Sequence, residues 1–304
     1  MSTRVETLAA TERVGSSART RKRLHRLVLH AFLLTIALIW LFPLLWAVYT
    51  SFRPYSDTLE HGYVSFTGNL SLVNYENAWA QAEIPKYFIN TVIIVAPAVV
   101  IVLFLASMMA FATSRFSWRF NVTLLLLFTA ANLLPPQVII NPLFRMYLAL
   151  PLPPFLSDNG SFYNQYFGIM AIHVAFQLGF CTFVLSNYMK TLPIELNEAA
   201  FVDGASVWRI FWQITLPLTR PALAALAVLQ VTWMYNDFFW AIVLMKDGAR
   251  FPITSSLNNL KGQFFTDNNL VAAGAIMVAL PTLIVFFMLQ KQFVRGLTLG
   301  STKG

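Results

Sequence analysis

The sequence predicts an all-α, polytopic membrane protein, and three features of its 304 residues carry that prediction. Hydrophobic residues make up 57% of the chain and charged residues only 11%, whereas a typical soluble domain carries about 25% charged residues. The mean hydropathy is +0.62. The apolar residues gather in six long runs. A disordered chain and a disulfide-stapled secreted domain are excluded, because the sequence holds 27 Phe and a single cysteine, Cys181.

Each apolar run is long enough to be a transmembrane helix, which needs about 20 residues to cross a hydrocarbon core about 30 Å thick. The runs are apolar on every face, whereas strands of a membrane barrel would alternate with a period of two, so helices are expected. In the third run Pro135 and Pro136 must kink or break the helix. A broken helix often marks a transport path, and a plain kink is the alternative. The six predicted spans are residues 27–50, 87–112, 121–147, 166–188, 222–245 and 270–290.

The basic residues predict the orientation of these spans. An even number of spans places both termini on one side, and that side carries 15 of the 21 Lys and Arg residues, against 6 on the other. The positive-inside rule therefore places both termini in the cytoplasm. The basic tail, residues 1–26, is predicted to be disordered because it is rich in Ser, Thr, Arg and Ala. Binding to nucleic acid or anionic lipid would be an alternative role for this tail, but topology explains its charge, so no nucleic acid partner is expected.

The fourth loop, residues 189–221, is cytoplasmic in this topology and is predicted to be structured. Pro193 can occupy the first turn of a helix that runs through Glu195 to Phe201, and Glu195 suits the dipole of that helix. Gly204 falls where a left-handed residue commonly ends a helix.

A second helix is predicted after Gly204, with Ser206 as its N-cap. Pro217 and Pro221 are expected to close it before the fifth span. The two helices form a helix–turn–helix that either packs on its own bundle or docks into the groove of a partner. One apolar stripe runs along the second helix at Val207, Ile210, Phe211 and Ile214.

Three groups of residues in this loop, read together, identify a family. The loop contains Glu198-Ala199-Ala200, then Asp203-Gly204-Ala205, and finally Ile214 with Leu216-Pro217. These residues resemble the EAA loop of the permease subunits of ABC importers. That motif consists of E-A-A, a glycine, an isoleucine and a Leu-Pro pair at the spacing found here, and the match is complete at those positions.

The remainder of the chain resembles the carbohydrate branch of that family, which contains the maltose permeases. The resemblance covers about residues 25–304 and departs from the family at Tyr235, where W-N-D-F has a tryptophan. The segments similar to its S-L-K-P, N-Y, F-x-N-S/T, W-N-D-F and C-terminal G-L-T motifs are Ser51–Pro54, Asn74-Tyr75, Phe88–Thr91, Tyr235–Phe238 and Arg295–Thr298.

The resemblance implies the six-span fold of a type I ABC importer permease in the bacterial inner membrane. It implies one permease subunit of an ATP-driven sugar importer, which forms half of the translocation path. The implied partners are a second homologous permease, two copies of an ATP-binding subunit, an external solute-binding protein or lipoprotein, the sugar and membrane lipid. The expected domains are the tail 1–26, the permease domain 27–292 and a cytoplasmic tail 293–304.

By the same resemblance, residues 189–221 are the coupling loop, which sits in a cleft of the ATP-binding subunit. Glu198 would face donors of that subunit, and Gly204 would allow the sharp turn. The C-terminal tail is a second expected contact with the ATP-binding subunit. The implied coupling residues are Glu198, Ala199, Ala200, Asp203, Gly204, Ile214 and Pro217.

No cofactor, metal or catalytic site is expected in this chain. The dipeptide Gly-Lys never occurs, so no P-loop is present, and ATP and Mg are expected on the partner subunit. His25, His30 and His61 lack the spacing of metal ligands, and Cys181 is expected to be a packing residue.

Three polar residues within the predicted spans are candidates for the translocation path: Asn236, Asp237 and Gln177. Asp237 is the one acidic residue predicted inside a span, where an ionisable group is costly and a functional role is the default. It either lines the path with Asn236 or holds two spans together, unless it lies at the outer interface and meets water. Gln177, like Asn132 and Gln137, can bond to sugar hydroxyls or to a neighbouring helix, and His173 is expected to be a satisfied interior histidine.

Two other functional classes compete with the importer permease. An ion-coupled secondary transporter of a small polar solute is the main alternative, but it would favour several intramembrane charges and an inverted repeat. A membrane-embedded enzyme would need a cluster such as H-E-x-x-H or a serine–lysine pair within the spans. The sequence shows none of these features, so a transport subunit without enzymatic activity is predicted.

Overall fold

The computed structural model describes residues 2–66, 68–132, 134–262 and 265–298, and within these ranges the side chains of residues 24–288. Every regular element in this part of the chain is a helix, apart from an isolated β-bridge between Pro151 and Ser161. The predicted all-α fold class is therefore confirmed.

Long helices alternate with short ones along the chain. Four short helical turns of 3-10 or π type are η1 (Pro136–Ile139), η2 (Phe211–Thr215), η3 (Gly248–Arg250) and η4 (Leu257–Leu260). The α-helices are α1 (Ser2–Ser51), α2 (Tyr55–His61), α3 (Val73–Gln81), α4 (Ile84–Arg115), α5 (Asn121–Asn132), α6 (Ile140–Ala149), α7 (Tyr166–Thr191), α8 (Glu195–Val202), α9 (Val207–Ile210), α10 (Leu216–Tyr235), α11 (Phe239–Leu244), α12 (Ile253–Ser256) and α13 (Asn268–Thr298).

Five helices in the described ranges are long and apolar enough to cross a membrane, and the count becomes six if the bent pair α5 and η1–α6 is one span. The third predicted span, residues 121–147, is therefore not one straight helix: its two halves meet at 90°. Pro135 and Pro136 explain the turn, because each lacks a backbone N–H and its ring clashes with the preceding turn. The fifth span also differs from the prediction, since its apolar helix covers Val207–Tyr235 and α11 follows after a break.

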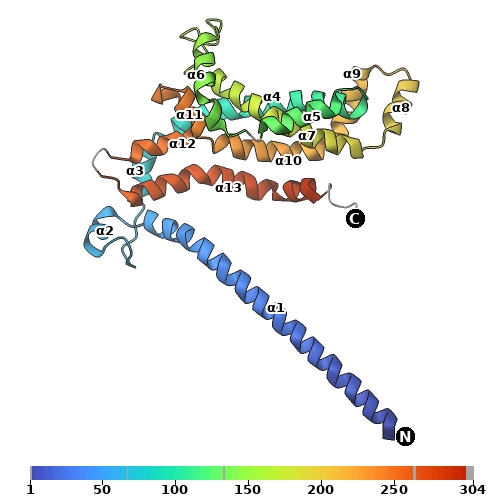
Figure 1. Cartoon of the computed structure of the whole chain (residues 1–304). Coiled ribbons are helices and arrows are strands. Elements are labelled where there is room, and N and C mark those ends of the chain that lie inside the picture. The colour runs from blue at the N-terminus through green and yellow to red at the C-terminus, as the bar shows by residue number, and fades with distance from the viewer. Residues whose placement is uncertain (1, 67, 133, 263–264, 299–304) are drawn as a thin grey trace.

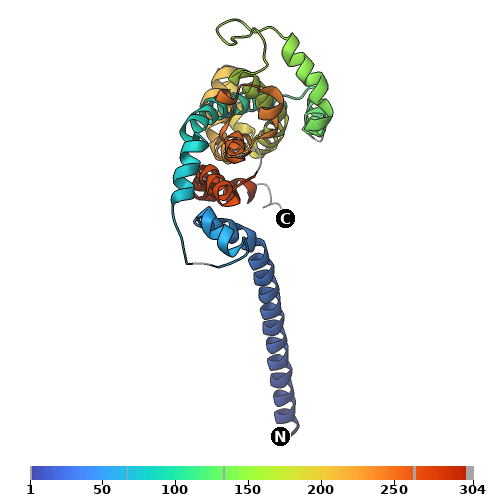
Figure 2. The same cartoon turned by 90° about the vertical axis from the view of Figure 1, so that its left-hand side faces the viewer.

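The body of the molecule is a bundle in which α4, α5, α7, α10 and α13 run side by side (Figures 1 and 2). Helix α4 packs along α7 through a row of small residues at every fourth position, which lets the two backbones approach closely. This row joins Cys181 and Leu185 of α7 in one buried cluster, so Cys181 is a packing residue as predicted. The residues of the row are Ala98, Val102, Ala106 and Ala110.

The bundle has two ends, which differ in the elements they carry. The α8 end holds α8 and α9, and the α3 end holds α2, α3, α11 and α12 (Figure 1). Both ends are built from short helices that cap the long ones. Residues 189–221 therefore lie at the opposite end of the bundle from the loops that follow α1 and α10.

Helix α1 leaves the bundle at the α3 end and runs away from it (Figure 1). Its apolar span, Leu24–Ser51, is unburied along its most apolar stretch, and the side chain of Trp40 is 76% exposed. An apolar helix of this length with no protein neighbour along it must face lipid or another membrane protein.

A buried ion pair holds α1 at the α3 end. Arg53 is fully buried, and its Nε donates to Oδ2 of Asp57 at 2.8 Å. The carbonyl oxygen of Arg53 accepts from Nδ2 of Asn74 in α3, at 2.7 Å, and from Nδ2 of Asn269 in α13, at 3.0 Å. This polar corner therefore joins α1, α3 and α13.

The two predicted tails differ from the structure in different ways. The structure continues α1 back to Ser2, whereas residues 1–26 were predicted to be disordered. The segment contains no proline, which is the strongest helix breaker, and its Arg and Ala residues favour a helix. In the predicted C-terminal tail, α13 extends to Thr298, and residues 299–304 lie outside the described part of the chain.

Candidate functional site

Helix α8 forms the first half of the predicted helix–turn–helix and ends as the sequence predicts. Glu195 and Glu198 lie in its first turn, where carboxylates favour the helix dipole. At its end the N–H of Ala205 donates to the oxygen of Ala200 at 2.9 Å, and the N–H of Gly204 donates to Phe201 at 3.0 Å. Gly204 has a φ of +78°, so the turn is a Schellman motif that requires the left-handed conformation.

The second half of the loop begins as predicted and then differs. Ser206 caps α9 by accepting from the N–H of Arg209 at 3.3 Å. Pro217 and Pro221 do not close this helix, because the chain continues through the π turn η2 into α10 without a break. Pro217 lies in the first turn of α10, and the wider π turn before it accommodates the missing N–H.

The apolar stripe predicted on the second helix packs mainly on the bundle itself. Ile210 and Phe211 are buried, and the ring of Phe211 lies 5.4 Å from that of Phe111 in α4. A different apolar surface stays free at the α8 end, formed by Phe201, Val202 and Trp208; we call it the exposed loop face. Val202 is 88% exposed. The predicted stripe did not identify this surface, because Phe201 and Val202 belong to the first helix of the loop and not to the second.

The predicted coupling residues divide into an exposed and a packed group. Glu198, Ala199, Asp203 and Gly204 are exposed beside the exposed loop face. Ala200, Ile214 and Pro217 are buried or half-buried against the bundle. The structure therefore places four of the seven residues where a partner can reach them.

A second group of predicted residues lies in the seam between α7 and α10. Nε2 of Gln230 donates to Oε1 of Gln177 at 3.3 Å. Nε2 of His173 lies 3.7 Å from Oδ2 of Asp237. The sequence did not pair these two residues, because Asp237 lies in the break between α10 and α11 and His173 lies in α7. Gln177 thus holds α7 against α10, whereas Oδ2 of Asp237 is buried between them without a hydrogen-bond partner among the described residues.

The break between α10 and α11 is organised by Asp237. Its Oδ1 accepts from the N–H of Trp240 at 3.4 Å, and its carbonyl oxygen accepts from Oγ1 of Thr254 at 2.6 Å. Asn236 lies next to it but is exposed, and its Nδ2 donates to the oxygen of Thr232 at 2.8 Å. Of the three predicted path residues, only Asn236 is fully exposed.

Two aromatic pairs, which sequence analysis did not identify, flank this seam. The rings of Phe180 and Trp233 lie 5.3 Å apart, and so do those of Phe176 and Trp240. The sequence offered one signal for Trp233: it lies three residues before the predicted path residue Asn236, and residues at that spacing share one face of a helix.

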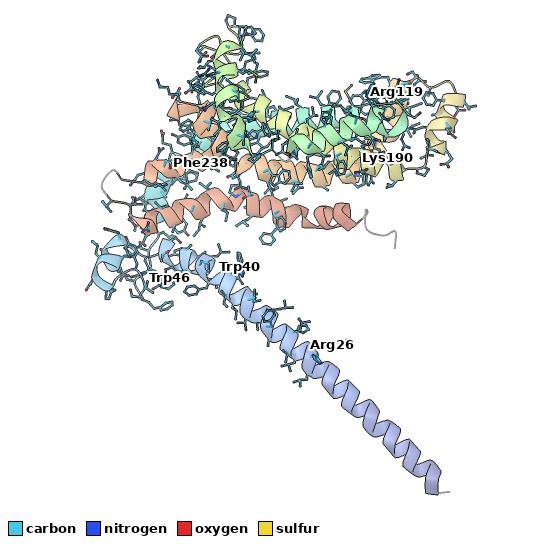
Figure 3. All side chains as sticks on the ribbon, viewed as in Figure 1. Arg26, Trp40, Trp46, Arg119, Lys190 and Phe238 are labelled. Atoms are coloured by element: carbon cyan, nitrogen blue, oxygen red, sulfur yellow. The ribbon has the colours of Figure 1, made fainter. Side chains whose placement is uncertain are left out.

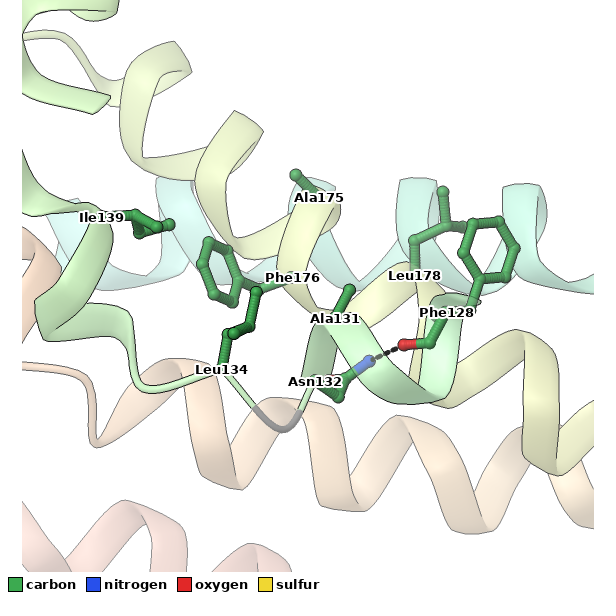
Figure 4. A pocket seen from close by; sticks show the side chains of 9 residues that line it. Phe128, Ala131, Asn132, Leu134, Ile139, Ala175, Phe176 and Leu178 are labelled. Atoms are coloured by element: carbon green, nitrogen blue, oxygen red, sulfur yellow. Dashed lines mark hydrogen bonds between the residues drawn. The ribbon is translucent and has the colours of Figure 1, made fainter. Parts of the chain in front are cut away.

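A cavity of about 220 Å³ lies beside these aromatics, between the break of the third span and α7 (Figure 4). Asn132 lies at its edge, with Nδ2 donating to the oxygen of Phe128 at 3.0 Å. Phe176, Leu178 and Gly179 line its α7 side. The 90° turn of the third span thus leaves a hollow in the bundle.

The F-x-N-T segment of α4 fixes the loops at the α3 end. Nδ2 of Asn90 donates to the oxygens of Ala249 and Phe251, and Oγ1 of Thr91 accepts from the N–H of Ile253 at 2.7 Å. Tyr166 donates to Oδ1 of Asn90 at 2.7 Å. One motif therefore ties α4, α7 and the loop after α11 into a rigid surface.

Some basic residues and some aromatic residues lie in different parts of the molecule. Arg119 and Lys190 lie at the α8 end, and Trp40 and Trp46 stand along the free helix α1 (Figure 3). Arg115 donates to the oxygen of Leu192 at 3.3 Å and anchors the start of the loop 189–221. Within the described ranges no three His, Cys, Asp or Glu residues are grouped to hold a metal ion.

The chain matches known transport proteins over most of its length. Residues 102–298 match the family model described as binding-protein-dependent transport system inner membrane component. The osmoprotective compounds uptake permease of Synechocystis sp. is 34% identical, over 96% of this chain and 97% of that protein. The diacetylchitobiose uptake permease of Streptomyces coelicolor is 28% identical, over 95% of this chain and 93% of that protein.

A solved structure has the same fold. It is the crystal structure of a bacterial ABC transporter that imports the acidic polysaccharide alginate. The match has a TM-score of 0.74 at 21% sequence identity and covers 89% of this chain and 97% of that one. The overall fold of the chain is therefore one already known in a membrane transporter.

Proposed function

Since this chain belongs to the family of binding-protein-dependent transport system inner membrane components, we propose that it is one permease subunit of an ATP-driven sugar importer. It forms half of the translocation path and receives the closure of an ATP-binding subunit through residues 189–221. The observation that carries this proposal is the exposed loop face beside Glu198 and Gly204 at the α8 end. The uptake of diacetylchitobiose by a relative supports a sugar as the transported solute.

The energy source is proposed to lie on a separate subunit. The chain has no Gly-Lys dipeptide and thus no P-loop, so two copies of an ATP-binding partner would bind ATP and Mg. The exposed carboxylate of Glu198 and the apolar side chains of Phe201 and Val202 suit a cleft with basic or backbone donors at its rim and apolar walls. The C-terminal tail, residues 293–304, is proposed as a second contact with this partner.

A second, homologous permease is proposed as the membrane partner. Helix α1 leaves most of its apolar side chains free along the span. Near the α3 end, the half-buried Trp46 packs between the exposed rings of Phe42 and Phe66, which forms an aromatic row. Such a row is typical of a surface that a membrane protein buries on assembly. Lipid would cover the part of α1 that the partner leaves free.

The orientation proposed for the chain places the α8 end in the cytoplasm. The excess of Lys and Arg on that side supports this, as does the position of Arg119 and Lys190 (Figure 3). Both termini are then cytoplasmic, and the α3 end faces outward. The rigid loops around Asn90 would there receive the external solute-binding protein.

Copurification tests the assignment of the coupling loop. The chain is co-expressed with the ATP-binding subunit encoded in the same genome, and three variants are compared. Glu198→Lys and Gly204→Pro are expected to lose the bound ATP-binding subunit, because one reverses the charge at the contact and the other cannot adopt a φ of +78°. Glu76→Lys, an exposed charge reversal in α3, is the matched control and is expected to retain it. Normal copurification and normal sugar uptake in both loop variants would exclude the proposed role.

A further inference from the structure

The turn between α4 and α5, residues 116–120, lies at the α8 end but outside the loop 189–221 (Figure 3). Trp118 and Phe120 are 50% and 58% exposed, and their rings lie 6.0 Å apart. Arg119 stands between them in the sequence and is also exposed. Arg115 precedes the turn as the last residue of α4. We call Arg115, Trp118, Arg119 and Phe120 the basic–aromatic patch.

The turn is held in place by contacts with α4. Nδ2 of Asn121, the first residue of α5, donates to the oxygen of Thr113 at 3.3 Å and to the oxygen of Phe116 at 2.5 Å. The ring of Phe116 packs edge-on against that of Phe111 in α4, with centroids 5.8 Å apart. Because the turn is tied to α4 at both ends, the patch stays next to the end of that helix.

The positive charge of the patch lacks a carboxylate partner in the described part of the chain. Nη1 of Arg115 donates to the oxygen of Leu192 at 3.3 Å, while Nε of Arg115 is buried without a hydrogen-bond partner. Among the residues that the structure describes, neither Arg115, Arg119 nor the exposed Lys190 forms an ion pair. A partly buried guanidinium attracts an anion more strongly than one in water, because the lower dielectric screens the charge less.

A phospholipid with an anionic head group matches both parts of the patch. Aromatic side chains gather where hydrocarbon meets water, and Trp118 and Phe120 mark that level at the α8 end. The cytoplasmic leaflet has a negative surface potential, and basic pockets between helices on that side bind anionic head groups. The guanidinium of arginine suits phosphate oxygens. A free phosphate ion would match the charge but leave the two rings in water, so the rings favour the lipid.

We propose that the basic–aromatic patch binds an anionic phospholipid of the cytoplasmic leaflet, with the phosphate at Arg115 and Arg119 and an acyl chain against Trp118 and Phe120. The bound lipid also steadies the coupling loop, because Arg115 holds the oxygen of Leu192 near the start of that loop. The proposal rests on the orientation given for the proposed function, in which the α8 end is cytoplasmic, and it does not depend on which solute is transported.

Lipid binding to the purified complex tests the patch directly. The complex is titrated with phosphatidylglycerol or phosphatidylcholine, and bound lipid is counted by native mass spectrometry. Wild type is expected to prefer phosphatidylglycerol, and Arg119→Gln is expected to weaken that binding about fivefold, because a charge near the membrane surface is lost. Arg145→Gln, at an exposed arginine of α6, is the matched control and should bind as wild type does. Equal binding in the two variants would overturn the proposal, as would displacement of the lipid by inorganic phosphate but not by chloride at equal ionic strength.

Fluorescence quenching shows whether lipid or another subunit covers the aromatic part of the patch. The assembled complex, with its ATP-binding subunits, is placed in nanodiscs of phosphatidylglycerol with or without bromine on the acyl chains. The emission of wild type minus that of Trp118→Phe reports Trp118 alone. We expect brominated lipid to quench this difference. If brominated lipid leaves it unchanged, Trp118 lies against the ATP-binding subunit or in water, and the proposal is overturned.

Sugar uptake separates the patch from the proposed function. In phosphatidylcholine vesicles, added phosphatidylglycerol is expected to raise ATP-driven uptake by wild type and by Arg145→Gln, and to raise it less for Arg119→Gln. If wild type takes up sugar with ATP while Arg119→Gln keeps both the lipid and its effect, the patch fails and the proposed function stands. If wild type takes up no sugar but binds phosphatidylglycerol through Arg119, the proposed function fails and the patch stands. Lipid that binds through Arg119 without changing uptake would overturn the link to the coupling loop.

Discussion

Gly204 determines the geometry of the turn at the α8 end. Its φ of +78° lets the N–H groups of Gly204 and Ala205 donate to the last carbonyl oxygens of α8, and it directs the chain into α9. The sequence was sufficient to predict this turn, because the glycine, the helix before it and the cap Ser206 are all local. The packing of the same loop was not predictable, because it depends on Phe111 of a distant helix.

A substitution of Gly204 tests the turn. Gly204→Ala adds a Cβ that meets no atom within 4 Å, so only the left-handed backbone is penalised. We expect a loss of about 1 kcal/mol in the free energy of unfolding, measured by denaturant or thermal unfolding in detergent. Gly248→Ala, with equal space and no positive φ, is the control. Equal losses in the two variants would contradict the assignment of the turn.

Arg53 connects several segments at the α3 end, although the sequence motif that contains it did not predict its partners. Its guanidinium bonds to Asp57, Gly62, Tyr63 and Ser65, and its carbonyl oxygen bonds to Asn269, more than two hundred residues later in the chain. No local pattern predicts such a contact. The S-L-K-P-like segment therefore has a structural role, because it sets the direction of α1.

The buried pair predicts a large effect of removing one partner. Arg53→Met leaves the carboxylate of Asp57 buried without its charge partner, and we expect a loss of about 3–5 kcal/mol in the free energy of unfolding. The exposed pair Lys86–Glu83, at 2.9 Å, provides the control. Lys86→Met is expected to cost far less, because water screens an exposed ion pair. Both are measured by unfolding in detergent, and equal values would contradict the buried pair.

Among the elements, the third span shows what proline can and cannot predict. Pro135 and Pro136 indicated a kink or a break, and the structure has a 90° turn. The direction of the turn depends on where α6 packs against α11, which is a tertiary contact. The fifth span gives the opposite result: Pro217 and Pro221 were expected to stop a helix, but they lie within α10, with the π turn η2 before it.

The contact between α5 and α7 makes Gly179 a second test. A Cβ at Gly179 would lie 2.9 Å from Nδ2 of Asn132 and 2.9 Å from the oxygen of Phe128, so the two helices would have to separate. We expect Gly179→Ala to lower the free energy of unfolding by about 1–3 kcal/mol. At Gly68, a Cβ meets no atom within 4 Å, so Gly68→Ala is the control. If Gly179→Ala unfolds as wild type does, the close packing of α5 on α7 is wrong.

At the scale of the whole molecule, composition and hydropathy were enough to predict a helical membrane protein, and one loop was enough to identify its family. What they could not predict is how the spans meet. His173 of α7 lies close to Asp237 in the break between α10 and α11, and α1 projects away from the bundle. The first of these features arises from long-range packing, which no local sequence pattern encodes.

This chain is proposed to move sugar with energy that a partner draws from ATP. The most direct measurement is sugar uptake into proteoliposomes that contain the chain, the second permease, the ATP-binding subunits and the external binding protein. We predict uptake only when ATP is inside the vesicles, and its loss with Glu198→Lys. Uptake without ATP that follows an imposed proton or sodium gradient would contradict the account and favour a secondary transporter.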